Sequence, residues 1–374
     1  MNKKVLSIGF VVLLFSLSII NLLKPQRDFS ENENRFLQKF PSARADTIFS
    51  GKFSSDFADY SSDQFIGRDG WISFKTIAEL SLLKKDNGRV YFGKNGTLFD
   101  ATEKIDENRL LENTVIISDY IEALREKLPG LDASVLLIPT ASEVNSELLP
   151  TFAPVPDQQT AIRSVKAVIW ENAKVCDPTD LLKSSKGNYL YYRTDHHWTT
   201  EAAYLVYTKW AQENGLNPVS REDLDVRQVS GSFYGTLYSK ANLFTIKPDS
   251  VKAYSFSGAV PVSAAYGKNK TTDSLYFNEY LSEKDKYSYF LGGNRPLIEI
   301  NTGTKNGKTM MIIQDSYAHC FVPFLTSHYE RILVLDPRYL SNIDYQEYAV
   351  ENNVILISNK AVENKGKKRY NNER

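Results

Sequence analysis

Proton-transfer side chains are concentrated in the run from Tyr191 to Thr199, which holds two of the four histidines of the chain next to Asp195. A second run, residues 310–316, is apolar until it ends on Gln-Asp-Ser, with Ser316 last. Serine hydrolases and acyltransferases need a serine nucleophile, a histidine base and a carboxylate that orients the base. The two runs supply all three groups, so we interpret them as parts of one active site for acyl chemistry.

The spacing within the first run assigns different tasks to its two histidines. In an extended segment, residues two apart project to the same face and neighbours to opposite faces. Asp195 and His197 are therefore expected to face one cleft, where the carboxylate orients the imidazole and the imidazole acts as a general base. His196 is expected to point away from this cleft, and Trp198 to cover one side of the His197 ring.

Ser316 lies where a buried strand is predicted to turn into a helix. Such a turn presents the hydroxyl at the carboxyl edge of the sheet, and the free N–H groups of the next helix can stabilise an oxyanion. Asp315 is expected to cap that helix. His319 would lie on its first turn, too close in sequence and too far round the helix to be favoured over His197 as the base.

The elements that must hold these groups alternate between helices and short apolar strands from about residue 104 onward. Short continuous apolar runs are typical of parallel strands buried on both faces, so the pattern predicts an α/β fold. Helices are predicted at residues 110–128, 161–172 and 200–214, and strands at 133–139, 310–314, 331–335 and 354–357. Residues 216–290 interrupt the pattern as an excursion that either shapes a substrate cleft or forms a peripheral β elaboration.

The N-terminus predicts a single membrane helix. Residues 5–23 carry no charge and would extend about 28 Å as a helix, close to the thickness of the hydrocarbon core of a bilayer. We favour an uncleaved anchor at residues 1–24 over a signal peptide, because the apolar run continues past a weak cleavage site at Ser16-Leu17-Ser18. No second apolar span follows, so the rest of the chain is predicted to lie outside the cytoplasm as the exported part of a single-pass membrane protein.

Between the anchor and the α/β pattern, residues 25–103 are predicted to form a polar stalk, a helical segment and a hairpin. Aromatic residues and leucines recur there at helical spacing, and Asn95-Gly96 is a strong hairpin signal. The catalytic domain is assigned to residues 104–359. Residues 360–374 are charged and are predicted to be a solvated tail.

Charge and cysteine content narrow the class of protein. Lysine plus arginine and aspartate plus glutamate are balanced at 45 each, so no global field indicates a nucleic-acid partner. Cys176 and Cys320 match no metal-binding spacing and form either a disulfide or two buried free thiols.

Asp-His-His also opens the signature of the DHH phosphoesterases, but the sequence lacks the further aspartates and the glycine-rich histidine motif that a two-metal site needs. We therefore assign no metal to the site.

Several segments resemble the DHHW family, which is similar to the AlgJ and AlgX type of SGNH-hydrolase-like polysaccharide O-acetyltransferases. The main segments are Asp195–Thr199, with the letters DHHWT, and Gln314–Tyr317, with the letters QDSY. Shorter matches lie at residues 30–35, 63–65 and 322–325, so the resemblance covers nearly the whole chain after the anchor. It implies an SGNH-hydrolase-like, flavodoxin-like three-layer domain with a permuted motif order, in which the Asp-His pair precedes the serine.

The resemblance also implies an activity. Ser316 would be the nucleophile, His197 the base and Asp195 the orienting carboxylate of an extracytoplasmic polysaccharide O-acetyltransferase. A membrane-bound O-acyltransferase partner would supply the acetyl group, which passes through an acetyl-serine to a sugar hydroxyl without a cofactor. Gln314 stands where many SGNH enzymes have glycine, which leaves the oxyanion donors less defined.

Four further residues are candidates for oxyanion or substrate contact. Asn294, in a glycine-rich turn, is the candidate second oxyanion donor, because SGNH enzymes use an asparagine or glycine N–H there. Arg193 and Tyr192 either bind an anionic sugar or complete a surface ion pair, and Trp198 lies beside them. Two other functions fit the same residues, a carbohydrate acetylesterase with the same triad and a non-catalytic glycan-binding scaffold.

Overall fold

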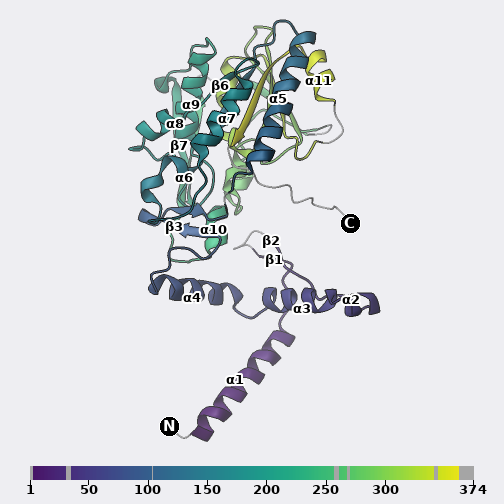
Figure 1. Ribbon diagram of the computed structural model, residues 1–374, viewed down its shortest axis with the longest axis vertical. Helices are drawn as coiled ribbons and strands as arrows, with labels where there is room; N and C mark the ends of the chain where they lie inside the picture. Colours follow the sequence, from purple (N-terminus) through teal and green to yellow (C-terminus); the bar gives the residue numbers. More distant parts are fainter. Residues whose placement is uncertain are drawn as a thin grey trace. The chain divides into compact units, whose positions relative to one another are not determined.

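The computed structural model describes residues 3–30, 35–102, 104–256, 261–267, 270–340 and 344–361. The chain forms two compact units, and Figure 1 labels their α-helices and some of their strands. The first unit consists of Met1–Asn87 and Tyr238–Ile246, and the second of Gly88–Leu237 and Lys247–Arg374.

A mixed eight-stranded sheet is the centre of the second unit. Its strands are Ser134–Ile138 (β5), Lys174–Cys176 (β6), Val262–Ala265 (β9), Thr271–Thr272 (β10), Leu297–Thr302 (β11), Thr309–Ile313 (β12), Arg331–Leu335 (β13) and Val354–Ala361 (β14). They are ordered β10-β9-β11-β13-β12-β14-β5-β6, and the last five run parallel while β11, β9 and β10 pair antiparallel. All four strands predicted from the sequence lie in the parallel part, which confirms the α/β fold class.

Both faces of this sheet are covered, which explains why its parallel strands are apolar along their whole length. Leu136 and Met310 belong to the hydrophobic cluster on one face, whereas Val135 and Met311 belong to the cluster on the other. The first cluster includes α9, and the second includes α5, α7 and α11 (Figure 1). These helices are Glu107–Lys127 (α5), Gln158–Ile169 (α7), Thr200–Glu213 (α9) and Tyr345–Glu351 (α11).

Short elements surround the sheet. The two short α-helices are Ala141–Val144 (α6) and Thr179–Ser184 (α8), and the 3₁₀ helices are Lys94–Gly96 (η1), Ser146–Leu148 (η2), Arg221–Asp223 (η3), Asn278–Leu281 (η4), Lys286–Tyr289 (η5), Ser316–Cys320 (η6) and Val322–Ser327 (η7). The predicted hairpin is confirmed: Val90–Phe92 (β3) pairs antiparallel with Leu98–Asp100 (β4). Asn95 and Gly96 between them have φ angles of 58° and 74°, the left-handed conformation that this pair of residue types favours.

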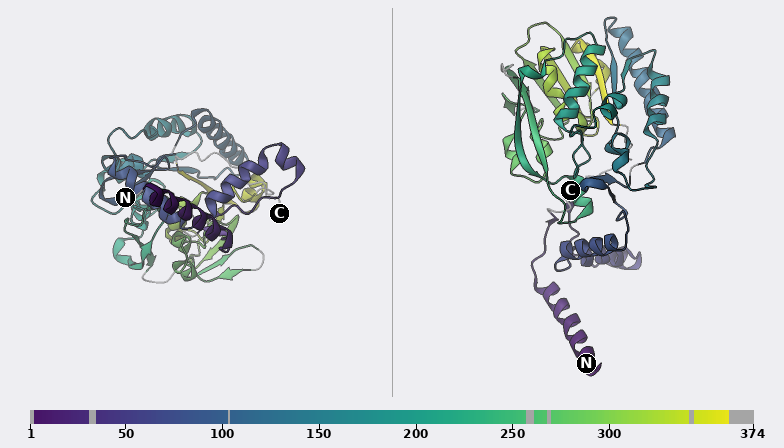
Figure 2. Two further views of the ribbon diagram at one scale, coloured as in Figure 1. Left: turned by 90° about the horizontal axis from the view of Figure 1, so that it is seen from below. Right: turned by 90° about the vertical axis from the view of Figure 1, so that its left-hand side faces the viewer.

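The excursion at residues 216–290 is only partly separate from the main sheet. Leu224–Phe233 (β7) and Asp249–Phe256 (β8) form their own antiparallel pair, visible as two long arrows in Figure 2. The helix Thr236–Ala241 (α10) lies between them in sequence. Farther along, β9 joins the main sheet beside β11. Residues 257–260 and 268–269 of the excursion lie outside the described residues.

The two cysteines are buried free thiols, so of the two predicted alternatives the disulfide is wrong. Cys176 ends β6 and Cys320 ends η6, on separate elements of the second unit. Each is 2% exposed or less, as expected for cysteine used as a small apolar side chain.

The first unit begins with Lys3–Leu23 (α1). Within the described residues, Lys3–Asn21 is the one helical stretch that is long and apolar enough to cross a membrane. The segment up to Asn87 also contains Phe29–Ser30 (β1), Arg35–Phe36 (β2), Ala45–Phe49 (α2), Lys52–Asp63 (α3) and Arg68–Ser81 (α4), and the unit is completed by residues 238–246, which include most of α10. The N-terminal segment of this unit ends at Asn87, and the domain boundary after residue 103 stays a prediction. Residues 31–34 of the predicted stalk and 362–374 of the predicted tail lie outside the described residues.

Candidate active site

The Asp-His-His-Trp motif lies on a tight loop between α8 and α9. Tyr191 and Trp198 form an antiparallel bridge across the loop, and the Thr199 N–H donates to the Leu190 carbonyl at 2.9 Å. The Thr199 hydroxyl then caps α9 by accepting a hydrogen bond from the Ala202 N–H. The loop therefore closes on itself before the helix begins, so the motif is held rigidly although it is not an extended strand.

Ser316 is the first residue of η6, and only Gln314 and Asp315 separate it from the end of β12. The Asp315 carboxylate accepts a hydrogen bond from the Tyr317 N–H at 3.0 Å, which confirms the predicted cap, although the helix is a short 3₁₀ helix rather than an α-helix. Because β12 lies between two parallel neighbours, Ser316 follows the carboxyl end of a central strand, where α/β proteins commonly bind their ligands.

A continuous chain of hydrogen bonds joins the loop to the serine. The Nε2 atom of His197 lies 2.8 Å from Oγ of Ser316, and its Nδ1 atom lies 2.6 Å from Oδ1 of Asp195. Because a carboxylate only accepts hydrogen bonds, Nδ1 carries the ring proton, and Nε2 accepts from the serine hydroxyl. Asp195 and His197 are only 2% and 6% exposed, so bulk water does not compete for these bonds.

Asp195 is held by two residues that follow it at a large distance in sequence. Its Oδ2 atom accepts hydrogen bonds from the N–H of Thr236 at 2.7 Å and from its hydroxyl at 3.1 Å. Gly235 packs so closely that an added Cβ would lie 2.2 Å from the Cβ of Asp195. Burial alone would raise the pKa of Asp195, but His196, His197 and these hydrogen bonds hold the pKa of this carboxyl well below its usual range. Gly235 and Thr236 could not be assigned to the site from the sequence, because no local pattern links them to Asp195.

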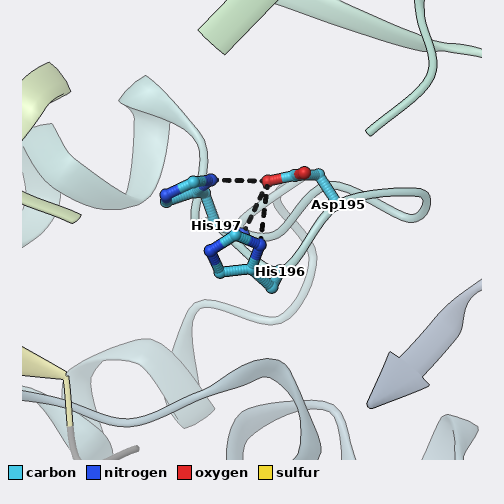
Figure 3. Close-up of side chains that lie close together, drawn as sticks. All are labelled: Asp195, His196 and His197. Carbon is cyan, nitrogen blue, oxygen red and sulfur yellow. Dashed lines mark hydrogen bonds and ion pairs between the residues drawn. The ribbon is translucent and has the colours of Figure 1, made fainter. Parts of the chain in front are cut away.

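The prediction that His196 points away is wrong. Its ring lies beside that of His197, with centroids 3.9 Å apart, and its Nδ1 atom is 3.7 Å from Oδ1 of Asp195 (Figure 3). The same Nδ1 atom lies 2.7 Å from the Thr236 hydroxyl. With the hydroxyl hydrogen directed to Asp195, the His196 ring donates to Thr236. The alternation rule fails here because the backbone forms a closed loop rather than a strand.

Tyr287, rather than Trp198, covers the face of the His197 imidazole. The Tyr287 ring, in η5, stacks on the ring of His197 with centroids 3.8 Å apart and planes within 9° of parallel. Trp198 is fully buried, and its indole N–H donates to the Tyr317 carbonyl at 2.8 Å. The Tyr317 hydroxyl in turn donates to the carbonyl of His196. Trp198 therefore connects the loop to η6 and holds the distance between base and serine.

Arg193 and Tyr192 make their contacts away from the serine. The Arg193 Nε atom lies 3.2 Å from Oδ1 of Asp249, whose side chain is fully buried, so Arg193 completes an ion pair. The Tyr192 side chain is buried against Phe233 and Tyr287, and its hydroxyl has no hydrogen-bond partner within the described part of the chain. Substrate contact by these two residues and by Trp198 stays a prediction, although burial leaves Tyr192 and Trp198 little surface for it.

Asn294 lies on an exposed turn and contacts other polar groups. Its amide donates to the Tyr339 hydroxyl at 3.3 Å, and its Oδ1 atom accepts from Arg338 at 3.4 Å. Arg338 is paired with Asp336, the residue that follows β13, so the turn lies near the carboxyl end of the strand next to β12. A role for Asn294 as an oxyanion donor stays a prediction.

His319, the alternative base, is poorly suited to that task. The side chain is 1% exposed, and neither ring nitrogen has a hydrogen-bond partner among the described residues. Burial, together with the nearby His197 and Arg338, lowers the pKa of His319 to about 3. The Gln314 side chain is likewise buried without a partner. Of the two candidate bases, His197 is therefore the one whose nitrogen lies within hydrogen-bonding distance of Ser316.

Asp195, His196 and His197 also lie close enough to be considered as metal ligands. One ligand atom from each falls within 4.8 Å of the others. However, both oxygens of Asp195 already accept hydrogen bonds, from His197 and from Thr236. The Nε2 atom of His197 is engaged with Ser316. The lone pairs that would bind a metal thus serve the hydrogen-bond chain, and the residues fit a proton relay better than a metal site.

Fold and site together define an α/β protein in which an Asp-His pair meets a serine after a central parallel strand. The chain belongs to the DHHW family: the model of the DHHW protein family matches residues 112–335, more than half of the chain and the part that contains Asp195, His197 and Ser316. The resemblance inferred from the sequence is thereby confirmed. No curated protein matches the chain significantly in sequence.

Two solved structures share the fold, and a third is more distantly similar. A DHHW family protein from Eubacterium siraeum DSM 15702 has 22% identity over 73% of this chain and 90% of its own, with a TM-score of 0.62. Bacillus cereus PatB1, solved with a sulfonyl adduct, has 16% identity over 74% of this chain and 97% of its own, with a TM-score of 0.61. The O-acetyltransferase domain of Pseudomonas putida AlgJ has 13% identity over 73% and 90% of the two chains, with a TM-score of only 0.46.

Proposed function

We propose that this DHHW protein is an extracytoplasmic polysaccharide O-acetyltransferase with a Ser-His-Asp triad and an acetyl-serine intermediate. The observation that carries the proposal is the unbroken hydrogen-bond chain from Ser316 through His197 to Asp195. Membership of the DHHW family, which resembles the AlgJ and AlgX type of acetyltransferases, supports acetyl as the transferred group.

In the first half of the reaction, the acetyl group moves from the donor to the enzyme. The Nε2 atom of His197 takes the proton of Ser316 while Oγ attacks the acetyl carbonyl. The bond from the acetyl carbon to the donor then breaks, and the leaving group receives the proton from His197. The Asp195 carboxylate, anionic because its pKa is low, stabilises the imidazolium that exists between these two transfers.

In the second half, a sugar hydroxyl takes the place of the donor. It gives its proton to His197, its oxygen attacks the acetyl carbon, and the Ser316 oxygen leaves with the proton returned from His197. The net reaction exchanges an acetyl group for a proton and needs no cofactor. If water reaches the acetyl-serine instead, the same residues perform ester hydrolysis.

We propose the backbone N–H of Ser316, at the start of η6, as the first oxyanion donor, because the first N–H groups of a helix have no intrahelical partner. Asn294 is proposed as the second donor. Replacement of Asn294 by alanine is expected to lower kcat by about 10²-fold, the usual effect of losing one oxyanion donor.

We also propose the setting of this chemistry. The position of Ser316 after β12 supports an SGNH-hydrolase-like domain with permuted motif order, since Asp195 and His197 come first in the chain. The apolar stretch Lys3–Asn21 supports a single-pass anchor with the catalytic unit outside the cytoplasm. The proposed acetyl donor is a membrane-bound O-acyltransferase, and the proposed acceptor is a cell-surface or exported polysaccharide.

Acetate release from an activated acetyl ester tests the mechanism. Ser316→Ala is expected to reduce turnover at least about 10³-fold, because no other group takes the place of the nucleophile. Ser327→Ala, which removes a hydroxyl that donates to the Phe324 carbonyl within η7, is the matched control and should retain activity. Mass spectrometry of the trapped wild-type enzyme should find the acetyl group on Ser316. Undiminished turnover in Ser316→Ala would sink the proposal.

Addition of an acceptor oligosaccharide separates the three possible functions. A transferase should form acetylated sugar at the expense of free acetate. A carbohydrate acetylesterase should release acetate at the same rate with and without acceptor and should deacetylate an acetylated glycan. A scaffold should bind glycan without turnover, and the Ser316→Ala variant should then bind it equally well.

A further inference from the structure

In helix α4 the fully buried residues are polar and several large apolar residues are exposed, the opposite of the pattern in an ordinary soluble helix. Its buried residues are Ser73 and Thr76, whereas Trp71, Phe74 and Ile77 are 55%, 65% and 36% exposed. The exposed apolar residues recur every three positions, so they form one continuous face of the helix. A soluble helix in water would bury this face and expose the other.

The two fully buried positions of α4 are polar because they are held by hydrogen bonds or lie beside them. The Ser73 hydroxyl donates to the carbonyl of Asn242 at 2.5 Å, and the Asn87 amide after the helix donates to the carbonyl of Lys240 at 3.1 Å. Both acceptors belong to residues 238–246, which form part of the same compact unit. Hydrogen bonds therefore fix which side of α4 faces inward, and the apolar side is left outward.

Further large apolar side chains are exposed on segments next to α4 in the chain. Leu82 and Leu83, directly after the helix, are 81% and 79% exposed. On the preceding helix α3, Phe57 is 42% exposed and belongs to a cluster of aromatic rings with Phe40 and Tyr60. An exposed apolar surface of this extent on a folded unit marks a contact with another apolar phase.

A hydrogen bond places this surface at the end of the candidate membrane span. The Ile66 N–H, in the corner between α3 and α4, donates to the Asn21 side chain at 2.7 Å. Asn21 is the last residue of the stretch that is apolar enough to cross a bilayer. Just beyond it, Gln64 exchanges two hydrogen bonds with the backbone of Arg27, which ties the same corner to the chain that leaves α1.

We infer that α4 lies in the interfacial layer of the membrane that α1 spans, with Trp71, Phe74 and Ile77 inserted among the lipids. The corner at Ile66 is one hydrogen bond from the end of the span, so a helix that starts there begins at the level of the lipid headgroups. Tryptophan and phenylalanine are the residue types that bind at this depth. The inference rests on the proposed anchor and is independent of the proposed acetyl transfer, because no residue of this face takes part in the triad.

The chain offers a clean test through its tryptophans. It has four, at positions 71, 170, 198 and 210, and none in α1. Trp198 and Trp210 are buried, whereas Trp71 and Trp170 are 55% and 69% exposed, and Trp170 lies in the other unit. If brominated phospholipids quench the tryptophan fluorescence, single replacements of Trp71 and Trp170 therefore show which of the two tryptophans is quenched.

The experiment uses the full chain reconstituted into vesicles of phosphatidylcholine and phosphatidylglycerol that contain phosphatidylcholine brominated near the headgroup end or near the middle of the acyl chain. Wild type and Trp170→Phe should be quenched, more by the shallow bromine than by the deep one, and Trp71→Phe should lose this quenching. Phe74→Asp should weaken it, whereas Phe152→Asp, a matched change at a residue that is 98% exposed in the other unit, should not.

Each other result overturns the inference. Equal quenching in wild type and Trp71→Phe would mean that α4 does not touch lipid. Absence of quenching together with disulfide crosslinking of a Phe74→Cys variant would assign the face to a second copy of the chain. Absence of both would assign it to another membrane protein. Failure of the protein to float with vesicles would overturn the anchor as well, whereas loss of ester turnover in Ser316→Ala concerns only the triad.

Discussion

Helices α4 and α9 both have 14 residues, yet they bury opposite kinds of side chain. Helix α9 buries Val206 and Trp210 in the core of the second unit, as a soluble helix does. Helix α4 buries Ser73 and Thr76 and exposes Trp71. Both helices have an apolar face, but α9 turns this face to the core and α4 turns it outward. The apolar face is therefore buried in α9 and exposed in α4, and this difference is the basis for the inference that α4 contacts lipid.

The buried site of the second unit should be the most sensitive part of the molecule. His197→Ala is expected to reduce ester turnover about 10³-fold, because the general base is lost. His196→Ala should cost only about 10-fold, since it removes a neighbour of Asp195 and a partner of Thr236 rather than the base. Steady-state kinetics on the activated acetyl ester measures both. A larger effect for His196 would reverse the division of tasks between the two histidines.

The two tryptophans sharpen the comparison between the helices directly. Trp210→Ala should lower the free energy of unfolding by about 3–5 kcal/mol, because it leaves a cavity in the core. Trp71→Ala should change it by no more than about 0.5 kcal/mol, because the side chain contributes to a surface and not to a core. Urea unfolding in mild detergent, followed by near-UV circular dichroism, measures the difference. Equal losses would mean that the outward face of α4 packs against protein.

Substitutions of Thr236 test whether its hydroxyl supports activity by positioning Asp195 and His196. Thr236→Val keeps the N–H that bonds Asp195 but removes the hydroxyl that bonds both Asp195 and His196, so turnover should fall about 10-fold. Thr236→Ser should restore most of it. The acid limb of the pH profile should move in the valine variant and return in the serine variant. A stability loss without any change in that limb would indicate a merely structural role.

Replacement of His319 should have the smallest effect, a change in how the free energy of unfolding depends on pH. Its pKa is lowered to about 3 by burial, while in the unfolded chain it is near its ordinary value of 6.5, so the unfolded state binds more protons between these two values. Stability from this group is therefore present above about pH 6.5 and is lost as the pH falls. His319→Leu should reduce the loss of stability between pH 7 and pH 5 by on the order of 1–2 kcal/mol. Urea unfolding at the two pH values measures it, and an unchanged slope would contradict the prediction.

Local patterns predicted much of the fold. The strands of the parallel sheet are continuous apolar runs, and the cap of η6 and the hairpin turn at Asn95-Gly96 depend only on neighbouring residues. The antiparallel strand β9 was hidden in the excursion, because four residues beside a long irregular stretch carry too weak a pattern. Its pairing with β11 arises from tertiary contact.

Residue types and their order show which groups are available: an Asp-His pair on a short run, a serine after an apolar strand and an apolar N-terminal helix. How these groups are held depends on the tertiary fold. Thr236 reaches Asp195 and Tyr287 stacks on His197 because distant segments fold onto one loop, and His196 turns inward because that loop closes. Likewise, α4 presents its apolar side outward because its polar side is hydrogen-bonded to residues 238–246. The residue type fixes the chemical group of a side chain, whereas the direction in which the side chain points and the group that it contacts depend on residues far apart in sequence.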